Sequence, residues 1–162
     1  MMLIHRSVQQ DDLAIICQFP QTPEELFFFY PKADYPLTVE QLMLAIDQRT
    51  HATVIEKDRE IAGFADFYHW ESGGCCKIGN VIINPKLRGQ GIAKYLMKTM
   101  TRKAREHYQA NQVQVSCFNE NSAALLLYKQ LGFTPFDIEE RINKQGKKVA
   151  LIHLAYELVY VL

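Results

Sequence analysis

The chain has 162 residues, with 18 basic and 18 acidic side chains, and hydrophobic residues make up 48% of it. Such a chain can bury a substantial core, and its charge balance argues against broad binding to nucleic acid or an anionic membrane. No run approaches the ~20 apolar residues of a membrane helix, and the N-terminus lacks the layout of a signal peptide. The four cysteines have no metal-site spacing, so we expect reduced thiols in a cytoplasmic protein.

The first third of the chain alternates short structured segments with turns. Leu3 to Val8 reads as a strand, and the acidic turn from Gln9 to Asp12 opens a helix. Four of the six prolines fall between residues 20 and 36 among many aromatic residues, which predicts a loop or short helix. This segment either packs over the domain edge or forms a wall of an acceptor pocket or a dimer contact. Thr38 is expected to cap a following helix through Leu42.

The middle of the chain predicts a sheet. His51 to Glu56 and Ile61 to Trp70 alternate as two antiparallel strands joined by a polar turn, and Cys75 to Asn84 is a further long strand. A helix follows, and one of its faces is apolar, formed by Ile92, Leu96, Met100 and Ala104. The lysines and arginines of this helix lie mostly on its other faces.

The last third completes the sheet with a strand at Gln112 to Phe118, a helix from Asn121 to Gly132, and a hairpin of Phe133 to Arg141 with Lys147 to Leu158. A strand–helix–strand crossover makes the two central strands parallel within an otherwise antiparallel sheet. We therefore predict an α+β (α/β) fold with one domain over residues 1–162. Its sheet is mixed and mostly antiparallel, with a parallel central strand pair and helices on both faces.

The stretch from Asn80 to Ala93 joins a β-branched strand, a glycine turn and a helix N-terminus, which is a common way to build an anion site. Gly89 and Gly91 allow a phosphate to approach the backbone closely, and Arg88 adds a cation. A P-loop would need a Lys-Ser/Thr pair after Gly91, and a Rossmann site would need a third glycine and an acid on the next strand. Neither pattern occurs in the sequence.

A second motif is Asn121-x-x-Ala124-x-x-x-Tyr128-x-x-x-Gly132-Phe133. Its side chains lie one turn apart on one helix face, and glycine suits the helix end. Taken alone, it also describes a buried helix with a capping Asn and a core Tyr, just as the glycine stretch also describes an ordinary strand-to-helix turn. Paired with Arg88-x-x-Gly91-x-Ala93, however, it resembles the GNAT superfamily of acetyl-CoA-dependent N-acetyltransferases over essentially the whole chain.

The resemblance implies a role for each matched position. Backbone groups of Val81, Ile82 and Ile83 would hold the pantetheine arm of acetyl-CoA and polarise the thioester carbonyl. Tyr128 would be the catalytic general acid, Asn121 would hydrogen-bond the CoA arm, and no metal is implied. Backbone amides would cradle the pyrophosphate; they belong to Arg88, Gly89, Gln90, Gly91, Ile92, Ala93 and Lys94.

The general base is not matched. The positions where many GNAT enzymes carry a carboxylate hold Lys77 and Ser116, neither of which does the work of a carboxylate at its ordinary pKa. A water chain, or an amine substrate with a lowered pKa, would make a base residue unnecessary. The remaining candidates in the sequence are Asp66, His69, Glu71, Glu120 and His153.

We therefore expect an N-acetyltransferase that moves the acetyl group from acetyl-CoA to a primary amine by direct attack in a ternary complex. The acceptor would be a small molecule or a peptide or protein amine, with no nucleic acid or membrane partner and with a homodimer left open. One alternative is a catalytically silent CoA-binding or sensor module. The other is an interaction module using the basic face of the helix from Ile92, which the net neutrality disfavours.

Overall fold

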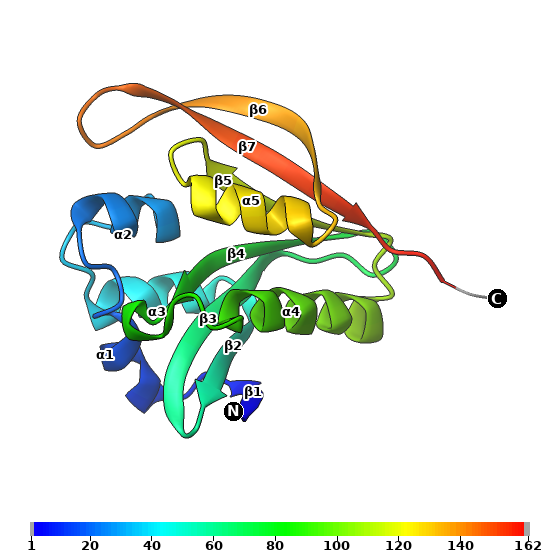
Figure 1. Ribbon diagram of the computed structural model, residues 1–162, viewed down its shortest axis with the longest axis horizontal. Helices are drawn as coiled ribbons and strands as arrows, with labels where there is room; N and C mark the ends of the chain where they lie inside the picture. The colour runs from blue at the N-terminus through cyan, green and yellow to red at the C-terminus, as the bar shows by residue number, and fades with distance from the viewer. Residues whose placement is uncertain (1, 161–162) are drawn as a thin grey trace.

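The structure is a computed structural model that describes residues 2–160, and it contains one mixed sheet (Figure 1). Residue 1 and residues 161–162, at the ends of the predicted domain, lie outside the described part. The strand order is β1-β2-β3-β4-β5-β7-β6, and only the β4–β5 pair is parallel. The strands are β1 (Leu3–Ser7), β2 (Thr50–Lys57), β3 (Glu60–His69), β4 (Cys75–Ile83), β5 (Gln112–Phe118), β6 (Thr134–Ile142) and β7 (Lys148–Glu157). The predicted α+β fold and parallel central pair are confirmed.

Helices cover both faces of this sheet. They are η1 (Gln10–Asp12), α1 (Leu13–Ile16), α2 (Pro23–Phe29), α3 (Val39–Asp47), η2 (Pro85–Leu87), α4 (Ile92–Tyr108) and α5 (Ser122–Gln130). The proline-rich segment contains α2, a short helix as expected, and Thr22 caps it by accepting a hydrogen bond from Glu25 N at 3.1 Å. Thr38 caps α3 in the same way, accepting from Gln41 N at 3.3 Å. Within residues 2–160, no helix combines the length and hydropathy needed to cross a membrane.

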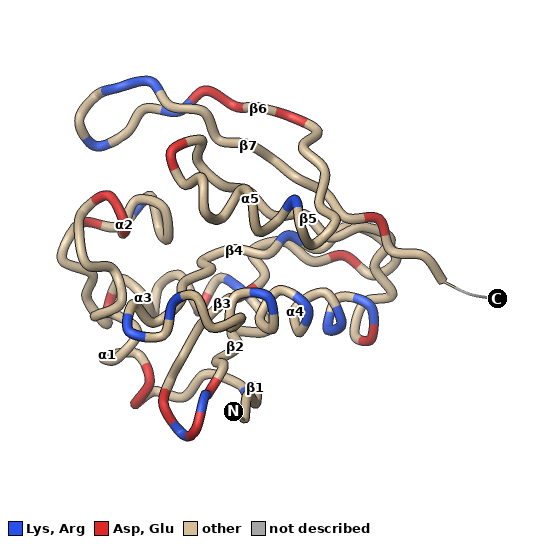
Figure 2. The backbone as a smooth tube through the Cα atoms, in the orientation of Figure 1, with Lys and Arg blue, Asp and Glu red and all other residues tan. Residues whose placement is uncertain are grey.

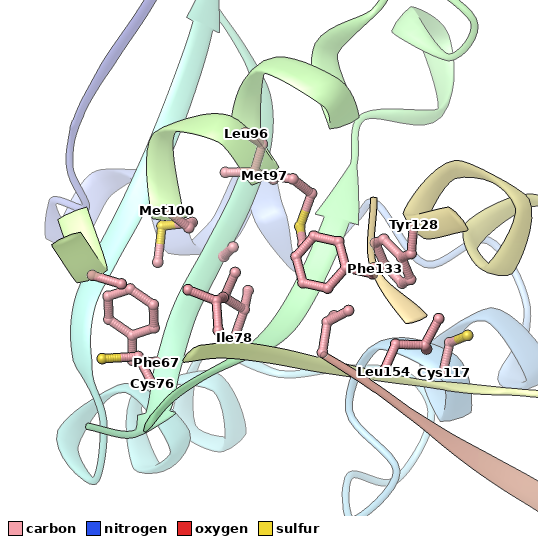
Figure 3. Close-up of a cluster of buried hydrophobic side chains, with 14 of the residues drawn as sticks. Phe67, Cys76, Ile78, Leu96, Met97, Met100, Cys117, Tyr128, Phe133 and Leu154 are labelled. Atoms are coloured by element: carbon pink, nitrogen blue, oxygen red, sulfur yellow. The ribbon is translucent and has the colours of Figure 1, made fainter. Parts of the chain in front are cut away.

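Two apolar cores lie on opposite faces of the sheet. On one face, α4 and α5 pack over the centre, and the predicted stripe of Ile92, Leu96, Met100 and Ala104 is fully buried. Figure 3 shows Leu96 and Met100 of this stripe within the core. On the other face, α1, α2 and α3 cover β2 and β3 around Phe64. Burying these apolar faces is the main force that holds the helices against the sheet.

The parallel pairing of β4 with β5 is short, and its end creates the opening in which the site lies. The register runs from Cys75 opposite Gln112 to Ile78 opposite Val115, whereas β4 continues to Ile83 and β5 continues to Phe118. Between Gly79 and Ile82, β4 carries an extra residue relative to β3, and Asn80 there adopts a φ of 50°. A bulge of this kind bends its strand, so β4 leaves β5 just beyond Ile78.

Candidate functional site

The glycine turn lies at the N-terminus of α4, directly after β4. Asn84 fixes its start, because its side chain accepts a hydrogen bond from Lys86 N at 3.0 Å and donates one to Ile61 O at 3.0 Å. The first hydrogen bond of the helix joins Tyr95 N to Gly91 O at 3.1 Å. The amides before Tyr95 in the first turn therefore have no helical acceptor and, together with the helix dipole, favour an anion at this end.

Gly89 and Gly91 give the turn its shape. Their φ angles are 77° and 80°, a region that residues with a Cβ rarely adopt, and a Cβ added at either glycine would meet no atom within 4 Å. The outer side of the turn is thus open space rather than packed protein. A turn of this kind fits a phosphate group, because the anion can approach the backbone amides without a side chain between them.

The side chains of the turn are held from two sides. Arg88 is about half exposed and forms an ion pair with Glu25 of α2, with 3.2 Å between Nη2 and Oε1. Gln90 accepts a hydrogen bond from Lys57 at the end of β2. These contacts connect the turn to α2 and to the β2–β3 hairpin, so the loop has fixed neighbours. Figure 2 places further lysines and arginines along α4.

The end of β4 presents one edge that β5 does not use. Ile82 and Ile83 pair with Phe64 and Gly63 of β3, while the pairing with β5 has already stopped at Ile78. Val81 and Ile83 are half-buried and Ile82 is buried. The predicted pantetheine-binding residues thus line the open edge of a strand, where an extended ligand can add as a further strand.

Tyr128 lies on α5 and packs into the core beside the opening. It is 4% exposed, and its ring centroid is 6.1 Å from that of Phe133 (Figure 3). Burial raises the pKa of Tyr128 well above its ordinary value, with a smaller contribution from Cys117, so the phenol keeps its proton at neutral pH. Asn121 occupies the N-cap position of α5 without a capping side-chain hydrogen bond among the described residues. Its amide is therefore not engaged in the capping role that the sequence also allowed.

The candidate bases differ in their burial and in their contacts. Asp66 is fully buried, and its carboxylate lies 2.9 Å from Arg49 Nη1. Burial raises its pKa to about 6, although the Arg49 charge acts in the opposite direction. Glu71 accepts a hydrogen bond from Cys75 N at 3.1 Å in the β3–β4 turn. His69 and Glu120 are exposed.

His153 has a different environment. Its Nδ1 lies 2.6 Å from Ser116 Oγ, and its Nε2 lies 3.5 Å from Glu139 Oε1. Ser116 is one of the two positions that lacked the expected carboxylate. The structure therefore brings a histidine to a place where the sequence had suggested no base.

The site consists of an amide-lined glycine turn, an open strand edge and a buried tyrosine. Residues 16–133, which include all three, match the Acetyltransferase (GNAT) family. The chain belongs to the GNAT acetyltransferase family.

The fold is also that of solved acetyltransferase structures. A protein described as a phosphinothricin N-acetyltransferase has a TM-score of 0.77 at 21% identity, covering 98% of this chain and 100% of its own. A Salmonella typhimurium protein described as an acetyltransferase was solved with its cofactor acetyl-CoA. It has a TM-score of 0.75 at 17% identity, and the match covers 100% of this chain and 97% of that protein. The ribosomal-protein-alanine N-acetyltransferase from Brucella melitensis has a TM-score of 0.76 at 18% identity, and the match covers 96% of this chain and 99% of that protein.

Several residues around this GNAT site gave no signal in the sequence. Arg49 reaches Asp66 and lies over the Tyr68 ring, with its Cζ 5.4 Å from the ring centroid. Asn80 at the bulge donates to Phe29 O at 3.0 Å and accepts from Arg49 at 3.2 Å. Together these contacts fix the bulge at which β4 leaves β5. They join residues far apart in the chain, so no local spacing could have indicated them.

The rings of the aromatic segment pack against two different parts of the domain. Phe29 is buried in the core beneath α2, with its ring 6.4 Å from that of Phe64. Phe27 instead stacks on Phe118, at the end of β5, with 4.5 Å between the ring centroids. The ring centroid of Phe28 lies 6.3 Å from that of Phe118. Since β5 ends beside the opening, the half-buried Phe27 lies next to the GNAT site and covers the buried Phe118 ring.

Proposed function

We propose that this GNAT protein is an N-acetyltransferase, which moves the acetyl group of acetyl-CoA to a primary amine by direct attack within a ternary complex. The observation that carries the proposal is the early end of the β4–β5 pairing at Ile78, beside the glycine turn that opens α4. An anion site and an unused strand edge then follow one another along the chain. That order suits a ligand with a diphosphate and an extended amide arm, which are the parts of CoA.

Acetyl-CoA is here a substrate, and the residues present suit its parts. The amides of Arg88 to Lys94 face the pyrophosphate, with the open side of Gly89 and Gly91 giving the phosphates room. The β4 residues Val81 to Ile83 receive the pantetheine arm along the strand edge, and Asn121 offers its side-chain amide from the start of α5. An N–H of β4 stabilises the charge that develops on the thioester oxygen.

The reaction forms one C–N bond and breaks one C–S bond. The acceptor ammonium first loses a proton, because an amine attacks only through its free lone pair and the ordinary pKa of an alkylamine, about 10.4, keeps it charged at neutral pH. The neutral amine then attacks the carbonyl carbon and the CoA thiolate departs. Tyr128 gives the thiolate a proton and regains one from the attacking nitrogen.

The acceptor side is bounded by Phe27, whose ring stacks on the buried Phe118, and by the polar face of β5 and β7. This surface suits an amine attached to an apolar or aromatic group. The solved relatives act on phosphinothricin and on a ribosomal-protein alanine, according to their descriptions, which gives a starting panel of acceptors. We include spermidine in the panel as a polycationic amine.

The test has two stages. Acetyl-CoA should raise the melting temperature of the protein, and thiol release should then be measured with phosphinothricin, with a peptide that begins with alanine and with spermidine. Thiol release that depends on the amine, with mass-spectrometric detection of the acetylated amine, supports the proposal. Stabilisation by acetyl-CoA without release of thiol would instead indicate the CoA-binding sensor, and no stabilisation would contradict both.

A further inference from the structure

A row of polar side chains crosses the sheet on the face opposite α4 and α5. Ser116 of β5 and His153 of β7 are directly opposed in the β5–β7 register. Glu139 of β6 is opposed to Leu151, two residues from His153, so its side chain lies on the same face. The residues that alternate with this row, Cys117 and Leu154, are buried in the core under α4 and α5. The row is therefore separate from that core.

The contacts along the row favour one tautomer of the neutral imidazole. Ser116 Oγ lies 2.6 Å from Nδ1, and Glu139 Oε1 lies 3.5 Å from Nε2. A carboxylate can only accept, so the nitrogen that faces it carries the proton. Nδ1 then has a free lone pair and accepts the proton of the Ser116 hydroxyl. Glu139 is itself fixed by Arg141, and this contact is the main reason that the pKa of Glu139 lies below its ordinary value.

The row reaches the opening between β4 and β5 at Ser116. Val115, the preceding residue, is opposed to Ile78 in the last parallel pair of the two strands. Ser116 is thus the first β5 residue beyond the point at which β4 departs. On the β4 side stands Gly79, where an added Cβ would lie 2.6 Å from the Tyr68 ring and 2.7 Å from Arg49. The absence of a side chain at Gly79 leaves room for the Tyr68 ring and for Arg49 at this point.

Other charged and titratable groups surround His153. From β6 come Glu139, Arg141 and Asp137, the last of which is directly opposed to His153 and accepts a hydrogen bond from Ile138 N at 2.9 Å. From β3 comes Tyr68, whose pKa is raised by partial burial while a hydrogen bond with Ser116 acts in the opposite direction. Lys77 stands on β4, and the Phe136 ring centroid lies 6.1 Å from that of His153. The imidazole is half-buried among these groups.

We propose that Ser116 and His153 form a proton relay that deprotonates the acceptor amine, with Glu139 as a positioning residue. The inference rests on the proposed function, since it names the groups that supply the missing base. In the step, one N–H bond of the acceptor ammonium breaks and its proton passes to Ser116 Oγ. The serine hydroxyl proton passes at the same time to His153 Nδ1, which leaves a neutral amine, an intact serine and an imidazolium beside Glu139. The imidazolium later releases its proton to solvent.

This relay also explains how the site works without a carboxylate at Ser116. A hydroxyl alone is far too weak a base, but a hydroxyl hydrogen-bonded to a neutral imidazole passes a proton on without being ionised itself. The histidine, and not the serine, then holds the proton. Its side chain, at 20% exposed, still touches solvent, through which the proton leaves.

The test compares the variants Ser116→Ala, His153→Gln and Glu139→Gln with wild type, and uses His69→Gln, an exposed histidine of β3, as a matched control. Thiol release is measured from pH 5.5 to 9 at saturating acetyl-CoA, with whichever amine of the panel reacts fastest with wild type. Acetyl-CoA affinity is measured separately by calorimetry and also reports folding. In wild type, kcat/KM should fall toward acid pH, because the relay needs a neutral imidazole.

We expect His153→Gln and Ser116→Ala each to lower kcat/KM about 100- to 1,000-fold and to remove this limb of the pH profile, while acetyl-CoA affinity stays within about twofold. The kcat/KM of the double variant should lie within about threefold of that of the less active single variant, because both residues take part in the same proton transfer. Glu139→Gln should have a smaller effect, and His69→Gln none. An unchanged limb in His153→Gln, or multiplying losses in the double variant, overturns the relay.

A second measurement does not depend on turnover. Imidazole nitrogen NMR of the wild-type protein should show His153 as the Nε2–H tautomer, with an Nδ1 signal that shifts in Ser116→Ala. The Nδ1–H tautomer would overturn the relay even in an active enzyme. If wild type binds acetyl-CoA but releases no thiol with any amine, the proposed function fails, and the NMR result alone then decides whether the relay contacts exist.

Discussion

Arg88 of the glycine turn and Glu25 of α2 form an ion pair, with 3.2 Å between Nη2 and Oε1. The contact joins the turn that precedes α4 to α2, the helix that carries Phe27 of the proposed acceptor side. It also places a carboxylate beside the cation that should meet the pyrophosphate. In the proposed site, Glu25 would therefore compete with the pyrophosphate of acetyl-CoA for Arg88.

Glu25→Gln should strengthen the binding of acetyl-CoA about two- to fivefold at low salt, because it frees the Arg88 charge. An exposed ion pair contributes about 1 kcal/mol or less, and the gain should vanish at high salt. Glutamine keeps an oxygen for the backbone N–H of Gln21, which in wild type donates a hydrogen bond to Glu25 Oε1 at 2.8 Å. Stability should therefore change by less than about 1 kcal/mol.

The control for this variant is Glu24→Gln, which changes the net charge equally and lies exposed on the same helix. Isothermal titration at two salt concentrations measures both variants. An equal gain in the two variants would assign the effect to net charge rather than to the ion pair. Weaker binding in Glu25→Gln would mean that the pair holds Arg88 in place for the ligand.

Gly91→Asp should abolish detectable acetyl-CoA binding, with a loss of more than about 100-fold, because it brings an anion into the space expected for the pyrophosphate. The control is Gly146→Asp in the β6–β7 turn, since Gly146 has the same φ of 80° and also has no atom within 4 Å of an added Cβ. Both variants should lose similar stability by thermal unfolding. Unchanged CoA affinity in Gly91→Asp would contradict the assignment of the turn.

Features that depend on neighbouring residues could be predicted from the sequence. The strand before the glycine turn, the turn itself and the apolar stripe of α4 all follow from local periodicity and glycine placement. For the same reason, Thr38 could be recognised as a helix cap. The fold class then followed from the order of these elements.

Features that depend on cross-strand register could not be predicted. The sheet order places β7 between β5 and β6. His153 of β7 therefore contacts Ser116 of β5 on one side and Glu139 of β6 on the other. Considered one residue at a time, the serine was only a missing carboxylate and His153 only one of five candidates. Likewise, the buried pair of Arg49 and Asp66 gave no local signal, although it excludes Asp66 as a free base.

Asp66 should make the protein less stable as the pH rises through the mildly acid range. Burial raises its pKa from 3.8 to about 6, so the folded protein holds this proton more tightly than the unfolded chain does. The resulting stabilisation is fully present below pH 3.8 and is lost as the pH rises through about 6, with a total on the order of 3 kcal/mol. Urea unfolding of wild type and Asp66→Asn between pH 4 and 7.5 measures it.

In that experiment, the stability of wild type relative to Asp66→Asn should decrease with rising pH. The exposed Asp47→Asn is the control and should leave the pH dependence of wild type unchanged. A relative stability that increases with pH would show that attraction to Arg49 outweighs the burial of the carboxylate.

Tyr128→Phe should lower kcat about 10- to 100-fold and leave acetyl-CoA affinity within about twofold, because the variant removes only the proton donor for the departing thiolate. The control is Tyr156→Phe, since Tyr128 and Tyr156 both pack against Phe133, with centroids 6.1 and 5.6 Å from its ring. Only Tyr128 is fully buried beside the opening, so Tyr156→Phe should keep wild-type turnover. Steady-state thiol release and isothermal titration separate turnover from binding. Equal losses of both in Tyr128→Phe would make this tyrosine a packing residue, and the proton for the thiolate would then come directly from the attacking nitrogen.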